Sequence, residues 1–180
     1  MDKLDLRAEL RQATADIHER LDRTVGQFDD RTSYRLYLEN TFRFRHSVEP
    51  ALAGHPLWPV QSLIPDLRQD LEDFGLSASV SEVAVPPLSD PAAQIGALYV
   101  LEGSGLGARL LFRRAEALGL DAQFGARHLA TQIGDPNRWR RFVALLDGAE
   151  DIDRSQAVAG AHAVFETALA LYAEKISERS

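Results

Sequence analysis

Cysteine is absent from this sequence of 180 residues, and the absence excludes several kinds of site. Disulfides, iron–sulfur clusters, thiolate-bound metals and cysteine nucleophiles all require a thiol. Any metal ligand must therefore be a histidine, a carboxylate, a tyrosine or the single methionine. The five histidines form no H-x-x-x-H pair and no G-x-S-x-G motif occurs, so zinc peptidase and serine hydrolase functions lack support.

Excess positive charge and long apolar runs are also lacking. The net charge is −7, and the only lysines are Lys3 and Lys175. Because duplex binding relies on a basic face that neutralises phosphates, this balance argues against a nucleic-acid partner. No apolar run approaches the roughly 20 residues of a membrane span, and the polar start MDKLDLRAELRQ is no signal peptide. We therefore expect a cytoplasmic protein without a membrane span.

Runs of β-branched residues are missing as well, and helical periodicity takes their place. Near the N-terminus, Leu6, Leu10, Ala13, Ile17 and Leu21 recur at spacings of three and four and mark one apolar face. The sequence predicts helices over Leu4–Val25, Thr32–Ala53 with an interruption near Pro50, Pro65–Phe74, Pro91 to Gly119, Arg127–Ile133, a segment capped by Asp135-Pro136 and ending near Gly148, and Asp153 or Ser155 to Ser177. The expected fold is a single all-α domain of six or seven helices over residues 1–180.

The predicted helix ends carry matching residues. Asp30 or Thr32 can cap the second helix, and Asp90 before Pro91 can cap the fourth. Gly75 and Gly119 follow the third and fourth helices, where a left-handed residue commonly ends a helix. Between these helices, residues 77–88 are loop-like, with room for one short strand.

The stretch Ile95–Phe112 (IGALYVLEGSGLGARLLF) holds three glycines in five positions, Gly103, Gly105 and Gly107. It fits the dinucleotide fingerprint G-x-G-x-x-G/A if Ala97–Leu101 is a strand. It also fits a helix whose bare middle lets a large flat ligand lie against the backbone, or a G-x-x-x-G contact between packed helices. A dinucleotide loop needs a second strand and an acidic residue about 20 positions later, and the helical spacing downstream offers no sheet. The ligand-facing helix is therefore the favoured interpretation.

His18 lies on the first predicted helix in a stripe of groups that suits a metal-bound ring. Asp22 follows one turn later, where its carboxylate can accept a hydrogen bond from Nδ1–H and leave Nε2 free to bind a metal. Thr14 precedes His18 by one turn and Arg11 precedes it by two. A lone histidine is commonly a surface or core residue, and zinc or non-heme iron would need further ligands. One histidine suffices for heme, because the porphyrin already supplies four nitrogens. The remaining histidines fit packing or turn positions better: His46, His55, His128 and His162.

The histidine stripe and the glycine stretch together resemble the heme oxygenase family, most closely its bacterial branch associated with bacteriophytochromes. The resemblance rests on LRQATADIHERLD over residues 10–22, GALYVLEGSGLG over residues 96–107, and GDPNRWRRF over residues 134–142. Either of the first two motifs alone is weak evidence, but the pair, in this order in an all-helical chain of this size, is fairly specific. The resemblance implies a heme-oxygenase-like bundle with heme between a proximal helix and a distal helix opened by glycines.

In function, the resemblance implies an oxidoreductase that opens heme b, its substrate and cofactor at once, at a meso carbon. The products would be biliverdin, carbon monoxide and ferrous iron. His18 matches the family's proximal iron ligand, with Thr14 and Asp22 at the flanking positions, although mammalian relatives carry Glu where this chain has Asp22. Gly103 and Gly107 match the pair that lets the distal helix lie over the iron.

Further positions follow from the same resemblance. Arg11 and Tyr99 match positions that bind heme propionates from the two helices, and Arg138 in the late arginine cluster is an additional candidate. Ser104 stands where mammalian enzymes have an aspartate that orders distal water, so that role passes to backbone groups and water or is unfilled. Relatives often read GSTLGG or GSSLGG where this chain reads GSGLGA. We expect Gly105 to loosen the distal helix and Ala108 to restrict it.

The implied partners are heme, an external electron donor and a bilin acceptor. Electrons must come from a separate ferredoxin or flavin reductase, since the chain has no flavin or iron–sulfur motif. A bacteriophytochrome is the acceptor that the resemblance suggests. Two other classes stay open at this point: a helical heme carrier or sensor without turnover, and a nucleotide-binding protein that uses Gly103–Ala108. Heme with ascorbate separates them, because only the enzyme forms biliverdin and only the nucleotide binder lacks a Soret band.

Overall fold

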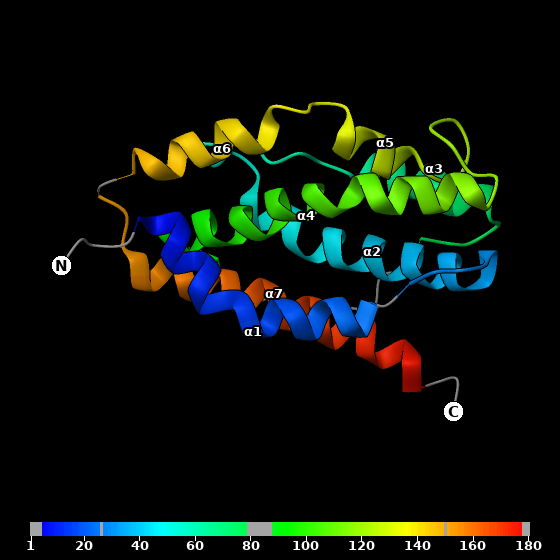
Figure 1. Cartoon of the computed structure of the whole chain (residues 1–180), viewed down its shortest axis with the longest axis horizontal. Coiled ribbons are helices and arrows are strands. Elements are labelled where there is room, and N and C mark those ends of the chain that lie inside the picture. The colour runs from blue at the N-terminus through cyan, green and yellow to red at the C-terminus, as the bar shows by residue number, and fades with distance from the viewer. Residues whose placement is uncertain (1–4, 26, 79–87, 150, 178–180) are drawn as a thin grey trace.

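The computed structural model describes residues 5–25, 27–78, 88–149 and 151–177, and within these ranges it contains seven helices (Figure 1). They are α1 (Leu6–Val25), α2 (Arg31–Leu52), α3 (Ile64–Asp73), α4 (Pro91–Ala117), α5 (Arg127–Ile133), α6 (Arg138–Asp147) and α7 (Arg154–Ser177). The described residues contain no strand, only an isolated bridge between Asp121 and Gly125. The all-α prediction is therefore confirmed. The possible short strand falls mostly on residues 79–87, outside the described part of the chain.

Several helix ends match the capping chemistry of the sequence. Asp30 caps α2, accepting a 2.7 Å hydrogen bond from the backbone N–H of Ser33, whose own side chain completes a capping box. Asp90 caps α4, with Pro91 in the first turn. Gly75 and Gly119 adopt φ angles of 65° and 76°, the left-handed conformation that ends α3 and α4.

Two predicted boundaries are wrong for identifiable reasons. Pro50 does not interrupt α2, which continues to Leu52. With the helix ending two residues later, the proline removes only one hydrogen bond from the final turn. Asp135 does not cap α6, which begins at Arg138. Instead its carboxylate accepts a 3.1 Å hydrogen bond from the backbone N–H of Asn137 and pairs with Arg141, so the Asp-Pro pair forms a turn before the helix.

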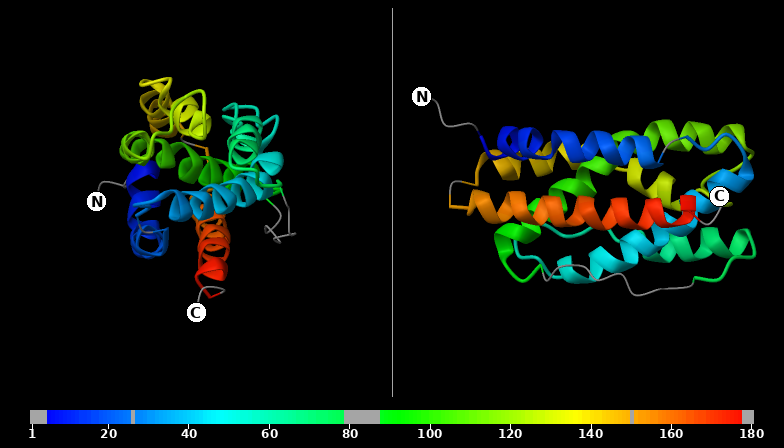
Figure 2. Two further views of the ribbon diagram at one scale, coloured as in Figure 1. Left: turned by 90° about the vertical axis from the view of Figure 1, so that its right-hand side faces the viewer. Right: turned by 90° about the horizontal axis from the view of Figure 1, so that it is seen from below.

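Helices α4 and α7 pack with their backbones in contact. A methyl group added at Gly96 would lie 1.7 Å from the carbonyl oxygen of Ala157, and one at Gly160 would lie 2.0 Å from that of Ala93. Only glycine allows this approach. Helix α7 also packs against α1 and α2, and seen from below it lies between these two helices (Figure 2). It is thus the shared support of the bundle.

Helix α4 runs through the whole glycine stretch without a break. This overturns the dinucleotide-loop interpretation, because residues 97–108 are helical and no βαβ unit exists among the described residues. By length and composition α4 could also cross a membrane, but 44% of its most apolar window is buried inside the molecule. Its apolar character is that of a central helix, packed against α7 and α5.

The hydrophobic core is divided into two clusters that meet along α4. One cluster joins α4 through Leu101 to α1, α6, α7 and the last turns of α2, and the other joins α4 from Ala108 onward to α3, α5 and the earlier turns of α2. Residues 102–107 belong to neither cluster. The glycine segment is therefore the one part of the described α4 interior that apolar packing does not hold.

The backbone contact of α4 and α7 generates a stability prediction. We expect Gly96→Ala to lower the free energy of unfolding by about 2–3 kcal/mol or more, because the methyl group overlaps backbone atoms that cannot move aside. Gly107→Ala is the matched control on the same helix, since a methyl group there would meet nothing within 4 Å. Urea unfolding of both variants checks this, and a Gly96→Ala protein as stable as the control would contradict it.

Candidate functional site

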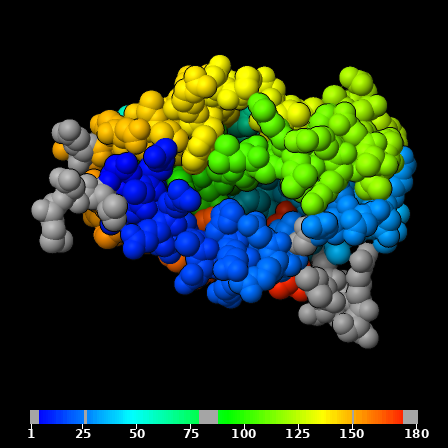
Figure 3. Space-filling model, in the orientation of Figure 1, coloured from blue at the N-terminus to red at the C-terminus, as the bar shows by residue number. Residues whose placement is uncertain are grey.

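A hollow separates α1 from α4 on one face of the molecule (Figure 3). Helix α1 rests on α7 and α6, and its contact with α4 is at most marginal. The two helices that the sequence analysis paired thus form opposite walls with α7 between them. This arrangement leaves room for a flat ligand with one face toward α1 and the other toward α4.

On the α1 wall, His18 is available for a ligand. Its side chain is 59% exposed, and its Nδ1 lies 3.2 Å from the Asp22 carboxylate. The ring also meets Phe165 of α7 in an edge-on contact, with ring centroids 5.7 Å apart. With Nδ1 facing Asp22, Nε2 is the nitrogen left for a metal. Thr14 is directed elsewhere: it is buried, and its hydroxyl donates a 2.7 Å hydrogen bond to the Leu10 carbonyl.

On the α4 wall, the glycines are open to solvent or ligand. A methyl group at Gly107 would meet nothing within 4 Å, and one at Gly103 would touch only Trp139, at 3.8 Å. The G-x-x-x-G packing interpretation therefore fails for this pair. On the same face Leu106 and Leu110 are 61% and 51% exposed, large apolar surfaces that a hydrophobic ring could cover.

One end of the hollow is basic. Tyr99 of α4 is half-buried and lies against Trp139 of α6, with ring centroids 5.9 Å apart. Burial raises the pKa of Tyr99, whereas the positive charges of Arg11 and Arg7 on α1 lower it. The charges of Arg11 and Arg7 on α1 therefore act on Tyr99 of α4, and propionate binding by Arg11 and Tyr99 stays a prediction. Arginine and tyrosine are donors suited to carboxylates.

Ser104 is fixed by hydrogen bonds from three elements. Its hydroxyl donates a 2.6 Å bond to the Leu101 carbonyl and accepts bonds from Arg45 of α2 at 3.2 Å and Gln132 of α5 at 3.1 Å. Arg45 is buried and also pairs with Glu49 at 3.5 Å. This set holds the middle of the glycine segment. Sequence analysis missed Arg45, because a buried arginine has no local signature.

Glu102, which precedes Ser104 on α4, is held by an ion pair with Arg138. Glu102 accepts hydrogen bonds of 2.8 and 2.7 Å from Arg138 and one of 2.9 Å from the indole N–H of Trp58. The Arg138 guanidinium also donates to the Pro59 carbonyl and stacks on Trp58. A ligand carboxylate would have to compete with Glu102 for Arg138. The structure therefore gives this candidate a role in anchoring α4.

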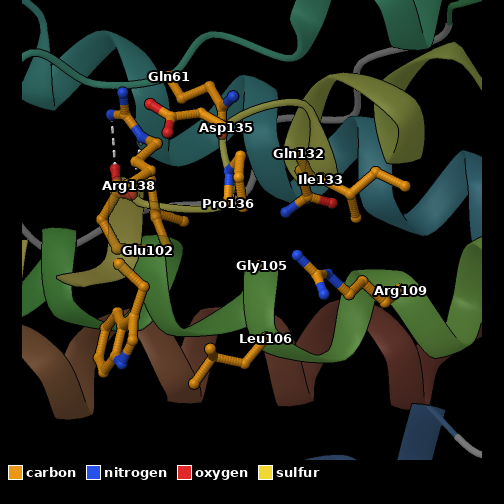
Figure 4. Close-up of a pocket in the computed structure, with 12 residues that line it drawn as sticks. Gln61, Glu102, Gly105, Leu106, Arg109, Gln132, Ile133, Asp135, Pro136 and Arg138 are labelled. Carbon is orange, nitrogen blue, oxygen red and sulfur yellow. Dashed lines mark hydrogen bonds and ion pairs between the residues drawn. The ribbon is translucent and has the colours of Figure 1, made fainter.

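Next to the Glu102–Arg138 pair, residues of α4, α5 and α6 line a pocket of about 380 Å³ (Figure 4). Gly105, Arg109 and Gln132 line it, together with Asp135 and Arg138. In Figure 4 the Leu106 side chain points from α4 toward α7, away from Asp135. Leu106 and Trp139 also line the pocket, so it extends to the glycine segment of α4.

His128 and Asp70 form a buried pair away from the hollow. Their side chains are fully buried, and His128 Nδ1 lies 2.8 Å from the Asp70 carboxylate while Nε2 lies 3.2 Å from the Tyr37 hydroxyl. Burial lowers the pKa of His128 more than Asp70 raises it. Burial raises the pKa of Asp70, but hydrogen bonds from His128 and Arg127 hold it below its usual value. The pair is a neutral imidazole beside a carboxylate, as its packing position suggested.

Taken together, the hollow suits a planar apolar ring with a metal at its centre and an acidic edge. His18 can supply one metal ligand, the bare segment of α4 can lie against the opposite face, and the arginines can take the acidic groups. Among the described residues no cluster of three or more His, Asp or Glu side chains could hold a free metal ion. A ring that brings most of its own metal ligands, as heme does, fits this set of donors.

Comparison with known proteins decides the family. The family model described as heme oxygenase matches residues 69–174. The chain is 34% identical over 151 residues to heme oxygenase PigA of Pseudomonas aeruginosa, covering 76% of this chain and 75% of that protein. The chain belongs to the heme oxygenase family. It is therefore an enzyme of heme degradation, and heme is its substrate.

Two further relatives agree with this assignment. A heme oxygenase of Xanthomonas campestris is 39% identical over 112 residues, covering 60% of this chain and 66% of that protein. The solved structure of the heme oxygenase from Neisseria meningitidis, studied with NO and CO bound, superposes with a TM-score of 0.84 at 26% identity. That match covers 97% of this chain and 94% of the other. The heme-oxygenase fold prediction is confirmed.

The His128–Asp70 pair generates a pH prediction. An unfolded histidine takes up a proton near pH 6.5, whereas the folded pKa of His128 is lower, so the unfolded state binds more protons as the pH falls. We expect the free energy of unfolding to fall below about pH 6.5, by up to about 1.4 kcal/mol per pH unit.

The contribution of this histidine is isolated by His128→Asn, which keeps an N–H donor near Asp70 but cannot titrate. Urea unfolding between pH 7 and pH 5 should give a shallower slope for the variant than for the wild type. An identical slope in both proteins would show that His128 is not responsible.

Proposed function

We propose that this enzyme opens heme at a meso carbon, using O₂ and external electrons, and releases biliverdin, carbon monoxide and ferrous iron. Heme bound in the hollow supplies both the iron at which oxygen is activated and the carbon that is oxidised. The observation that carries the proposal is the pairing of an accessible His18–Asp22 couple on α1 with an unpacked glycine segment on α4. Among the described residues His18 packs only edge-on against Phe165, and a methyl group at Gly107 would meet nothing within 4 Å.

The roles of the α1 residues follow from their chemistry. His18 binds the iron through Nε2, and Asp22 accepts the Nδ1 proton, which fixes the tautomer and the ring orientation. Phe165 limits rotation of the imidazole through its edge contact. Thr14 supports this helix through its bond to Leu10 and has no direct part in binding. Arg11, together with Tyr99 across the hollow, binds a heme propionate.

The α4 residues shape the oxygen side. Gly103 and Gly107 keep side chains out of the space beside the iron, so that the backbone alone approaches the ligand. The hydroxyl of Ser104 is already engaged with Leu101, Arg45 and Gln132. We therefore assign Ser104 to positioning the helix, with proton donation left to water or backbone groups.

Partners and location belong to the same proposal. The chain has no cysteine for an iron–sulfur cluster, so a ferredoxin or flavin reductase delivers electrons from outside. A bacteriophytochrome is the proposed bilin acceptor, in the cytoplasm, and residues 1–180 act as one domain. The direct test is purified protein with one equivalent of heme and ascorbate. Biliverdin and carbon monoxide support the proposal, whereas an unchanged Soret band would indicate a carrier or sensor.

The first prediction here concerns the iron ligand. We expect His18→Ala to lose the histidine-ligated ferric spectrum and most of the turnover, because the described α1 offers no second histidine. Added imidazole should restore both in part, since the removed ring leaves space for it. Matched variants are His46→Ala and His162→Ala. If His18→Ala keeps the native spectrum while either of these loses it, the ligand assignment is wrong.

The second prediction concerns Gly107. We expect Gly107→Ala to leave the melting temperature of the heme-free protein unchanged or raised, because alanine favours the helix by up to about 1 kcal/mol and its methyl group meets nothing within 4 Å. Heme should still bind through His18. Biliverdin formed per heme consumed should fall, because the methyl group crowds bound oxygen.

Thermal unfolding and product analysis on one preparation separate this role from a structural one. A helix-packing role would lower the melting temperature and keep the activity per folded molecule. An unstable but fully active Gly107→Ala protein would therefore refute the ligand-facing role of this glycine.

A further inference from the structure

Arg7 extends the functional stripe of α1 by one more turn. It precedes Arg11 by four residues and His18 by eleven, spacings that place all three on one face of the helix. Both arginines are exposed, and the first turn that carries Arg7 is fixed by a 2.6 Å hydrogen bond from the Ala8 N–H to the Asp5 carboxylate. The backbone that carries Arg7 is therefore fixed at the end of the stripe.

The charge of Arg7 reaches the opposite wall of the hollow. Burial raises the pKa of the Tyr99 hydroxyl, and Arg11 and Arg7 are the two cations that lower it. Tyr99 belongs to α4, so the charges of both arginines act on a group across the hollow from α1. This group lies at the basic end described above, beside Trp139.

Neither arginine is neutralised by the described part of the protein. No carboxylate there forms an ion pair with Arg7 or Arg11, and the neighbouring Glu9 is paired with Arg154 at 2.9 Å. Two like charges one turn apart repel each other, and a cation in the first turn of a helix is disfavoured by the helix dipole. Placed this way, the two cations favour an anion with more than one negative group.

We propose that Arg7 is a second propionate-binding residue, so that each of the two heme propionates has its own arginine. The proposal rests on the proposed function. Arg11 with Tyr99 holds one propionate, and Arg7, about 6 Å further along the helix axis, holds the other. Anchoring at two points fixes the rotation of the macrocycle about the axis through the iron. Arg7 is then a determinant of which meso carbon faces the open side.

The test compares heme with its dimethyl ester, in which both propionates are uncharged. Each is titrated into the wild type, Arg7→Gln, Arg11→Gln and the double variant, with Arg35→Gln as the control. Arg35 is exposed near the start of α2, on a different helix from the stripe, and its substitution removes the same charge. A second readout is the pattern of heme methyl resonances in the ferric cyanide complex, which reports ring orientation.

We expect Arg7→Gln to raise the dissociation constant for heme about three- to tenfold, the range of a partly exposed charge-assisted bond, and to leave that for the ester unchanged. A second set of methyl resonances and a broader biliverdin isomer mixture should accompany it. Equal loss of affinity for both hemes, or no change in affinity and resonances, would overturn the proposal.

The same titrations separate this proposal from the proposed function. A wild type that binds heme without a histidine-ligated spectrum overturns the proposed function itself. A preference for heme over the ester that Arg11→Gln abolishes and Arg7→Gln retains overturns only the role of Arg7.

Discussion

The backbone contact of α4 with α7, Gly96 against Ala157 and Gly160 against Ala93, is the constraint on which the arrangement of the helices depends. Because these two helices touch without intervening side chains, α7 can support α4 on one side and α1 on another. Helix α1 is then placed by α7 and not by α4. The gap between α1 and α4 is therefore a consequence of tight packing elsewhere, which keeps both walls rigid while the space between them stays open.

Within that frame the glycine segment has an unusual means of support. The two hydrophobic clusters end on either side of residues 102–107, and the segment is held by Glu102 and Ser104 through polar contacts. Hydrogen bonds are directional, whereas apolar contacts need side-chain volume that would fill the hollow. Polar anchors on the far face of α4 thus fix the helix and leave its near face bare. Arg45, which is buried, and Arg138, which is partly buried, belong to this support.

The features that sequence reasoning predicted well depend on neighbours along the chain. Helical periodicity located the stripe of His18 and Asp22, and capping rules located Asp30 and Asp90, because each involves residues within a few positions. Pro50 was misjudged because its cost depends on how soon the helix ends. The family resemblance supplied the proposed roles of Arg11 and Tyr99, which lie on different helices and share no local pattern.

The features that sequence reasoning missed all join distant segments. Arg45 meets Ser104, Asp70 meets His128 and Gly96 meets Ala157 only after folding, and none of these pairs leaves a periodic trace. This difference between local and long-range features also distinguishes the two walls of the candidate site. The residues of the α1 wall could be predicted from their spacing along one helix, whereas the α4 wall depends on contacts from α2, α5 and α6. Under the proposed function, substitutions that disturb the α4 wall should therefore be sought among residues remote from it in sequence, whereas those that disturb iron binding are expected on the α1 stripe.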